Sequence, residues 1–310
     1  GILVIIPKSV ISKNPINISI NNKEEAQFNN LLIVVEEDSE ATILINRTSN
    51  KFSKFTSNII EVISKDNSIL NIINLQNLEN ETNDFSTTKI LQGKNSEIVY
   101  TELGLGSNTS RSKITSVLEE EEASSKILSL NYCNNNQNFD INISAIHKSG
   151  FTYSNILSTN ILDNKSKLIF NGLIKIEENA HNSEGYQKEE NLLLSKDAEV
   201  YPIPNLEINN YDVKCSHGSS TTNIDEEKIF YLVCRGIERE EAKKMITLGF
   251  FDPLILRVAS DEIRAKIRYL IEAKWVGRKT ESFESKLLKE FMTEDSIKSG
   301  DVFEGHYKNR

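Results

Sequence analysis

Short apolar runs alternate with polar turn residues over the first 204 residues of the chain. Most runs contain β-branched residues, which favour strands, and polar residues typical of turns bound each one. The clearest runs cover residues 31–35, 41–45, 59–63, 69–73 and 97–101. This pattern predicts many short β-strands and therefore a mainly β protein.

The polar turns recur at a nearly constant distance along the chain. They lie at residues 37–39, 66–68, 94–96 and 122–124, a repeat of roughly 28 residues, which is within the range of stacked repeats. A repeat of this kind predicts a β-solenoid. A β-sandwich is the competing architecture, but it usually has more Gly and Pro turns than the 13 Gly and 5 Pro of this chain supply. Asn-rich turns suit a solenoid, because turn side chains of successive coils can stack into hydrogen-bonded ladders.

Apolar residues fall at helical spacing after Asp225, which is a predicted N-cap with two acidic residues behind it. Three helices are predicted, and their apolar positions are Ile229, Phe230, Leu232 and Val233; Ala242, Met245, Ile246 and Gly249; and Ile263, Ile267, Leu270 and Ile271. The first should end at Gly236 and the second near Asp252 and Pro253. We therefore expect a solenoid over residues 1–218, a helical domain over 219–276 and a polar extension over 277–310 with one further helix at 283–292.

Two residues that can bind metals lie where the strand pattern gives way to the helical one. Cys215 and His217 are separated by one residue, and Gly218 follows, where we expect the backbone to turn. A structural zinc site needs four ligands, and the other nearby cysteine, Cys234, falls within a predicted helix. The pattern alone therefore leaves open a simpler interpretation, a buried thiol beside a histidine satisfied by hydrogen bonds.

Several distinctive motifs lie around this junction. They are Pro-Asn-Leu-Glu-Ile at 204–208, Asp-Val-Lys-Cys-Ser-His-Gly at 212–218, Asp-Glu-Glu-Lys-Ile-Phe-Tyr-Leu at 225–232, Arg-Gly-Ile at 235–237, and Glu-Glu-Ala with Gly-Phe at 240–250. In this order and at these distances, they resemble the SufB/SufD family of iron–sulfur cluster assembly scaffolds. Upstream, the similarity continues through Ile146-His147, Thr152-Tyr153-Ser154, Phe170-Asn171-Gly172 and Asn191-Leu192-Leu193-Leu194. It covers most of the chain from Gly1 to about residue 251.

The resemblance implies a right-handed parallel β-helix that pairs with a second chain through its solenoid. The partner is then a SufB-like paralogue or a second copy. Members of this family usually carry a largely helical N-terminal domain, and the start at Gly1 without a methionine fits a chain from which such a domain has been removed.

The resemblance also implies which residues bind the cluster. In SufB-type members a cysteine needed for sulfur transfer stands where this chain has Glu189, whereas the Cys-Ser-His-Gly motif at 215–218 is typical of SufD-type members. The chain is therefore SufD-like, with His217 and Cys215 as ligands of a transiently bound iron–sulfur cluster. Glu189 is an additional candidate, because its carboxylate could supply an oxygen ligand in a homodimer.

An ATPase partner is implied in the same way. The sequence has no Gly-x-x-x-x-Gly-Lys-Ser/Thr phosphate-binding loop, so ATP hydrolysis would have to come from another protein. Family members bind the ABC ATPase SufC through their C-terminal helices. Phe230, Tyr231, Arg235 and Ile237 occupy the matching helix and turn, and the chain is expected to be a scaffold subunit without catalytic activity of its own.

Composition and charge disfavour several other partners, locations and functions. The net charge is −9 and no segment concentrates Lys or Arg, which disfavours nucleic acid as the main partner. Three cysteines are too few for a disulfide framework, which favours the cytoplasm, and the apolar start at residues 2–6 is too short to span a membrane. The alternative function is a carbohydrate-active β-helix protein, but the single Trp and the lack of an acidic cluster on a predicted strand face disfavour it.

Other polar residues have simpler interpretations. His147 is predicted to form structural hydrogen bonds, the acidic run at 119–122 is predicted to be a solvated turn, and His306 is predicted to be exposed in the tail. His181 with Glu184, and Glu189 with Glu190, could form acid–base pairs, but no nucleophile or activated water is evident near them.

Overall fold

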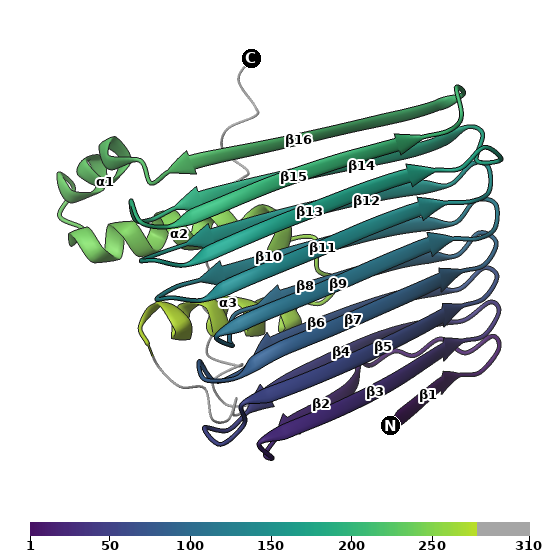
Figure 1. Ribbon diagram of the computed structural model, residues 1–310, viewed down its shortest axis with the longest axis horizontal. Helices are drawn as coiled ribbons and strands as arrows, with labels where there is room; N and C mark the ends of the chain where they lie inside the picture. The colour runs from purple at the N-terminus through teal and green to yellow at the C-terminus, as the bar shows by residue number, and fades with distance from the viewer. Residues whose placement is uncertain (278–310) are drawn as a thin grey trace. The chain divides into compact units, whose positions relative to one another are not determined.

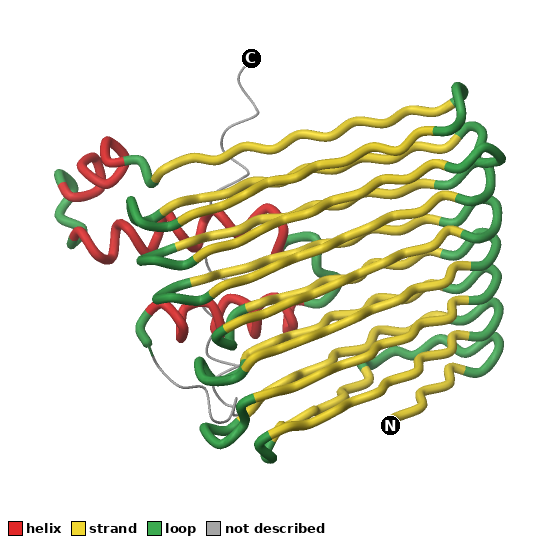
Figure 2. Tube along the Cα trace, viewed as in Figure 1, coloured by secondary structure: helices red, strands yellow, loops and turns green. Residues whose placement is uncertain are grey.

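The computed structural model describes residues 1–277, and the chain divides into two compact units at Asp225 and Glu226. The first unit contains the strands and the second the helices (Figure 2). The expected boundary at Gly218 falls inside the last strand, which continues to Asn223. The predicted helix at 283–292, His306 and nearly all of the polar extension lie outside the described residues.

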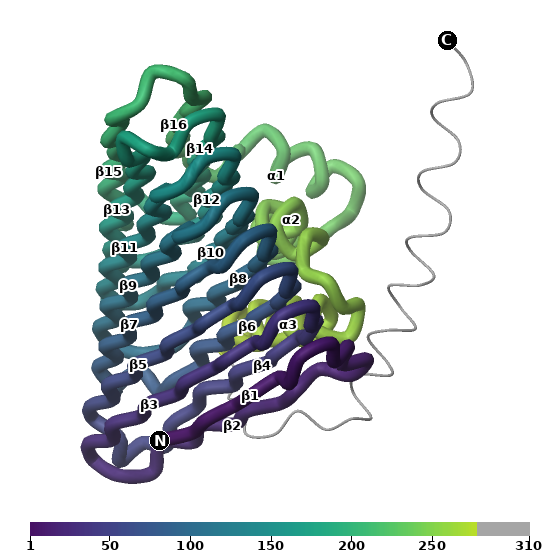
Figure 3. Tube along the Cα trace, turned by 90° about the vertical axis from the view of Figure 1, so that its right-hand side faces the viewer, coloured from purple at the N-terminus to yellow at the C-terminus, as the bar shows by residue number. Residues whose placement is uncertain are grey.

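The first unit is a stack of parallel strands in two sheets. The strands are β1 (Ile2–Ile6), β2 (Ile16–Asn22), β3 (Ala26–Val35), β4 (Glu40–Ser49), β5 (Phe55–Ser64), β6 (Ile69–Asn77), β7 (Asn83–Gln92), β8 (Glu97–Gly104), β9 (Thr109–Leu118), β10 (Ser124–Cys133), β11 (Asn138–His147), β12 (Tyr153–Leu162), β13 (Lys167–Ile176), β14 (Ser183–Leu193), β15 (Glu199–Ile208) and β16 (Val213–Asn223). Odd-numbered strands form one eight-stranded sheet and even-numbered strands the other (Figures 1 and 3). Each coil thus contributes one strand to each sheet, and the prediction of a mainly β protein with a parallel β-solenoid is confirmed.

Alternate residues of each strand point between the two sheets and form in-register columns. One column of the even-numbered sheet begins with the partly buried Ile16 and continues with five buried apolar or aromatic side chains, Ile43, Ile72, Tyr100, Ile127 and Ile156. Burying each of these side chains contributes about 1.5–3 kcal/mol relative to exposing it. In the last two coils the same column becomes polar, with Gln187 and then His217. The solenoid core is therefore apolar along this column until the coils that carry the candidate ligands.

The predicted turns stack as ladders on one edge of the solenoid. Asp38, Asn67 and Asn95 each have φ between 50° and 56°, in the left-handed region that Asn and Asp tolerate better than most residues. Asn67 Nδ2 donates to Asp38 Oδ1 at 3.0 Å, and Asn95 Nδ2 donates to Asn67 Oδ1 at 3.0 Å. The Asn-rich repeat therefore fixes both the turn conformation and its stacking.

Replacing Asn67 with valine should destabilise the protein by about 1–3 kcal/mol. A β-branched residue is costly at positive φ, and the two ladder hydrogen bonds are lost with the amide. Denaturant unfolding would measure the change. Asn67→Gly is the matched control, because it removes the same hydrogen bonds but accepts the backbone angle; equal losses in the two variants would show that the φ angle contributes nothing.

The second unit contains three described helices, α1 (Glu226–Val233), α2 (Arg239–Ile255) and α3 (Asp261–Trp275). All four predicted apolar positions of α3 are buried, and α2 ends at Ile255, shortly after Pro253, near which its end was predicted. Proline removes one backbone N–H, yet Leu254 and Ile255 beyond it are buried, and that burial offsets the loss. Lys244–Glu272 and Arg268–Asp252 ion pairs link α2 to α3. Within residues 1–277, no helix is both long and apolar enough to cross a bilayer.

Candidate functional site

Cys215 and His217 lie on β16, the terminal strand of its sheet, and pair in register with β14. Gly185 is opposite Cys215, Gln187 is opposite His217, and Glu189 is opposite Ser219. The three β14 residues are buried and face the interior, so their partners on β16 share that inward face. Because β16 ends the sheet, Cys215 is only half-buried and His217 is exposed. The last strand therefore presents both ligand types on one accessible face.

The expectation of a turn at this motif is wrong. Gly218 lies within β16, and the described glycines with positive φ are Gly236 and Gly277. The turn was expected because glycine accepts backbone angles that other residues avoid, but pairing with β14 holds the backbone extended to Asn223. As a result, the motif is held by a parallel ladder rather than by a loop.

The Cys215 sulfur sits above Gly185 of the preceding coil. A Cβ built on Gly185 would lie 3.6 Å from this sulfur and 2.6 Å from Ile174 Cγ2, so only glycine leaves room for the present packing. Burial raises the pKa of the Cys215 thiol, and a hydrogen bond from the Gly185 backbone opposes this shift. The thiol therefore stays protonated at neutral pH, and binding a metal would have to displace its proton.

His217 is exposed, and within residues 1–277 no hydrogen bond to its ring is present. The simpler interpretation, a buried histidine satisfied by hydrogen bonds, does not describe this geometry. It describes His147 instead, whose ring nitrogens contact Thr152 Oγ1 at 2.8 Å and Ser154 Oγ at 2.7 Å. Burial lowers the pKa of His147 to about 4, and its predicted structural role is confirmed.

Glu189 is a buried carboxyl group on the same inward face, with 1% of its surface exposed. Asn160 Nδ2 lies 3.4 Å from one of its oxygens and Ser219 Oγ 3.4 Å from the other. Burial raises the pKa of Glu189 to about 7, while hydrogen bonds from Asn191, Ser219 and Asn160 oppose the shift. At neutral pH this group can therefore either hold a proton or offer an anionic oxygen.

An amide ladder supports this end of the solenoid, and the sequence analysis missed it. Asn131 Nδ2 donates to Asn160 Oδ1 at 2.9 Å, Asn160 Nδ2 donates to Asn191 Oδ1 at 2.8 Å, and Asn191 Nδ2 donates to Thr221 Oγ1 at 3.3 Å. Their separations of 29 to 31 residues match the coil length, which was the signal available in the sequence.

The suggested acid–base pairs do not form. Glu190 binds Lys188 at 2.8 Å, and alternation along β14 places it on the face opposite Glu189. Glu184 bonds Lys214 and Tyr186, which lower its pKa. His181 is exposed at a turn, with Nδ1 3.1 Å from Asn179 O. Neither pair has the geometry of an acid–base couple.

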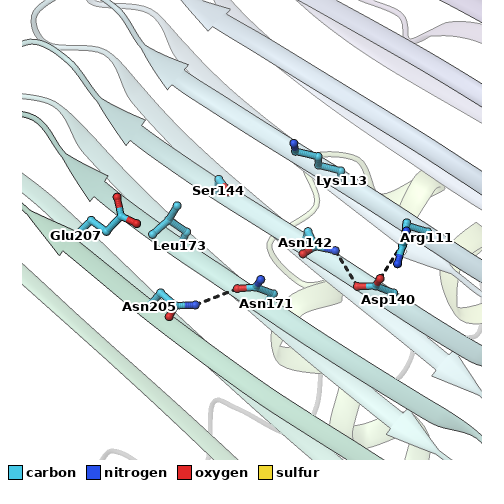
Figure 4. A pocket seen from close by; sticks show the side chains of 9 residues that line it. All are labelled: Arg111, Lys113, Asp140, Asn142, Ser144, Asn171, Leu173, Asn205 and Glu207. Carbon is cyan, nitrogen blue, oxygen red and sulfur yellow. Dashed lines mark hydrogen bonds and ion pairs between the residues drawn. The ribbon is translucent and has the colours of Figure 1, made fainter.

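A shallow groove of about 490 Å³ crosses the outer face of the odd-numbered sheet (Figure 4). Its side chains come from β9, β11, β13 and β15, and none of them is aromatic. One of its two acids, Asp140, accepts hydrogen bonds from Arg111 Nε at 2.8 Å and Asn142 Nδ2 at 2.7 Å. A glycosidase needs two cooperating carboxyl groups, so this groove does not favour the carbohydrate-active alternative.

The predicted ATPase-binding residues lie on α1 and the turn that follows. Phe230 and Tyr231 are 68% and 56% exposed, although aromatic side chains usually avoid water. The Arg235 guanidinium lies 3.5 Å from the centroid of the Tyr231 ring, a cation–π arrangement. Ile237 is only partly exposed. The first three residues thus form an exposed aromatic and cationic patch, here called the α1 patch.

The described chain does not contain a complete metal site. Within residues 1–277, no three His, Cys, Asp or Glu side chains are grouped so as to hold a metal ion. The fold and the candidate residues thus define a parallel β-solenoid protein whose terminal strand carries a thiol, Cys215, and an imidazole, His217, on one face.

Comparison with known proteins identifies the family. Residues 18–250 match the family described as "SUF system FeS cluster assembly, SufBD core domain". Iron–sulfur cluster assembly protein SufD of Escherichia coli is 31% identical over 232 residues, 74% of this chain and 55% of that protein. The SufBD family protein ycf24 of Porphyra purpurea is 29% identical over 241 residues (74% of this chain, 50% of that protein), and that of Antithamnion sp. is 31% identical over 241 residues (74% and 81%).

The chain therefore belongs to the SufB/SufD family of iron–sulfur cluster assembly proteins, as its motifs predicted, and it is SufD-like. It spans about half the length of the first curated relatives it matches, with 50–55% of each covered.

Proposed function

We propose that this chain is a SufD-like scaffold subunit for iron–sulfur cluster assembly, with Cys215 and His217 as ligands toward a transiently held cluster. The supporting observation is their placement side by side on the accessible face of β16, without a third ligand grouped with them in the described residues. Weak, incomplete ligation suits a scaffold, because the cluster must later leave. The chain is a non-catalytic subunit in this proposal.

A second solenoid completes the site in this proposal. β15 and β16 are the terminal strands of the two sheets, and an unpaired strand edge is a template for pairing with another chain. The partner is a SufB-like paralogue that contributes the missing cysteine, or a second copy of this chain. In a homodimer Glu189 supplies the additional oxygen ligand. Burial favours the protonated form of its carboxyl group, so Glu189 must lose this proton before it can bind the metal.

The ATP-dependent step belongs to a SufC-like ABC ATPase in this proposal. The α1 patch is its docking surface, because exposed aromatic and Arg side chains are the types that concentrate binding energy at interfaces. The complex acts in the cytoplasm.

Co-expression with a SufC-like ATPase and a SufB-like protein is the direct test. Purification through a tag on this chain should recover both partners at a fixed stoichiometry, and the reconstituted complex should contain iron and acid-labile sulfide. Absence of both partners, or cleavage of oligosaccharides by the purified chain, would contradict the proposal.

Replacing His217 with alanine should lower cluster yield severalfold on the assembled complex and leave stability within about 0.5 kcal/mol, because the ring is exposed and makes no hydrogen bond in the described structure. Iron content and melting temperature should be measured on the same preparation. Cys215→Ser is a needed companion, since the thiol can take over as ligand. The matched control is His181→Ala, another exposed histidine, which should change neither quantity. A lower melting temperature with normal iron content would contradict the assignment.

A further inference from the structure

Gln187 is a buried amide whose polar atoms have no partner. Its side chain is 4% exposed, yet neither Nε2 nor Oε1 makes a hydrogen bond in the described structure. Buried amides are usually satisfied, and an unsatisfied one calls for a specific explanation. Gln187 is also the first polar residue after six successive apolar or aromatic residues in its column.

The opposite sheet makes room for this amide. Gly172 on β13 faces the interior between Ile143 and Pro204 in the odd-numbered sheet. A Cβ built on Gly172 would lie 2.2 Å from Gln187 Nε2 and 2.6 Å from Oε1, so the amide lies against the glycine backbone across the interior. Any larger residue at 172 would displace it. The Gly172 and Gln187 pair thus places an unsatisfied donor and acceptor one coil below His217.

His217 is the next residue in the same column and shares the inward face of Gln187. A histidine that binds a metal through one ring nitrogen almost always donates its other ring N–H to an oxygen acceptor, which fixes the tautomer and the ring orientation. The other inward-facing neighbours are less suitable. Cys215 carries a thiol, and the Glu189 carboxyl group already interacts with Asn160 and Ser219.

We propose that Gln187 is the positioning residue for His217: rotation of the exposed imidazole brings one ring N–H to the Gln187 amide oxygen, which has no partner in the described structure, and leaves the other ring nitrogen free for the metal. The inference deepens the proposed function and rests on it only for the identity of the ligand. An uncharged acceptor holds the ring without adding negative charge to the site.

Nitrogen-15 NMR of histidine-labelled protein without metal provides the test. In the unchanged full chain, the two ring nitrogens of His217 should show that one tautomer predominates. Gln187→Leu should shift that tautomer ratio, whereas Gln187→Glu keeps an oxygen acceptor at this position and should keep one tautomer predominant. His147 is an internal reference, because its ring already bonds Thr152 and Ser154.

A merely structural glutamine predicts a different pattern. Replacing a buried, unsatisfied amide with leucine of similar size should then preserve or raise the melting temperature and leave the His217 signals unchanged. Unchanged signals in Gln187→Leu would overturn the proposal. Should that variant not fold, Gln187→Ala decides instead: it also removes the amide oxygen, and an unchanged tautomer ratio of His217 would overturn the proposal.

The same variants distinguish this inference from the proposed function. If Gln187 sets the tautomer but His217→Ala leaves cluster yield normal, the positioning inference stands and the ligand assignment fails. If His217→Ala lowers the cluster yield but substitution of Gln187 leaves the His217 ring-nitrogen signals unchanged, the ligand assignment stands and the positioning inference fails.

Discussion

Replacing Arg47 with leucine is expected to destabilise the protein by about 3–5 kcal/mol, because it leaves buried acidic groups without their cation. Arg47 is fully buried inside the solenoid, and its Nη1 lies 2.9 Å and 3.1 Å from the two oxygens of Asp84. Its Nε donates to Asn74 Oδ1 at 3.1 Å, and Nη2 lies 3.9 Å from Glu102. Denaturant unfolding would measure the change in the free energy of unfolding.

The loss should depend on pH. Burial raises the pKa of Glu102, and the charge of Arg47 is the largest of the opposing effects. Without Arg47 the pKa of Glu102 rises further, so the folded variant increasingly favours the protonated acid. Its deficit relative to the unchanged protein should therefore be smaller below the folded pKa and grow as the pH rises through it. A deficit that is constant with pH would show that Glu102 is not coupled to Arg47.

An exposed arginine gives a matched control for this prediction. Arg111 pairs with Asp140 at 2.8 Å on the outer sheet face, where 63% of its side chain is exposed. Arg111→Leu should cost less than about 1 kcal/mol, since solvent screens an exposed pair. If Arg47→Leu and Arg111→Leu lowered the free energy of unfolding equally, burial would not be the reason for the large effect expected at Arg47. A triple variant that replaces Arg47, Asp84 and Glu102 with apolar residues should recover much of the loss.

The solenoid was predictable because its signal repeats. Asp38, Asn67 and Asn95 lie at equivalent turns. Each has a positive φ, and their spacing along the sequence gives the coil length. The third helix was predictable for a similar reason, since four apolar residues at helical spacing all became buried. The second helix ends at Ile255, close to its predicted end near Pro253, and burial of Leu254 and Ile255 offsets the local effect of Pro253.

The site was only partly predictable. Cys215, His217 and Glu189 were identified by residue type and by family resemblance, but whether each faces the interior depends on the register of β14 and β16. A shift of one residue would turn all of them to the opposite face. Gln187 opposite Gly172 depends on the pairing of two sheets, and Arg47 meets Asp84 across 37 residues. No local pattern in the sequence reports such contacts.

Alanine at both Phe230 and Tyr231 should abolish recovery of the SufC-like ATPase with this chain. Truncating an aromatic anchor at the centre of an interface typically costs at least about 2 kcal/mol, so the double variant should weaken binding by about a thousandfold if the two effects add. Both side chains are exposed in the second unit, and the buried residue of α1 is Ile229, so folding should be preserved. Co-purification and calorimetric titration with the ATPase would measure the effect.

A matched apolar variant in the same unit separates docking from general surface hydrophobicity. Met245 on α2 is 48% exposed, and Met245→Ala should leave ATPase binding within about 0.5 kcal/mol of the unchanged chain. Arg235→Lys should give an intermediate loss, because lysine keeps the charge but not the planar group that stacks on Tyr231. If the Phe230 and Tyr231 variant still binds the ATPase normally while its melting temperature is unchanged, the α1 patch is not the docking surface. Truncation after about Pro204 would then show where the ATPase binds: retained binding would place the docking surface on the solenoid, and lost binding would place it elsewhere in the C-terminal part of the chain.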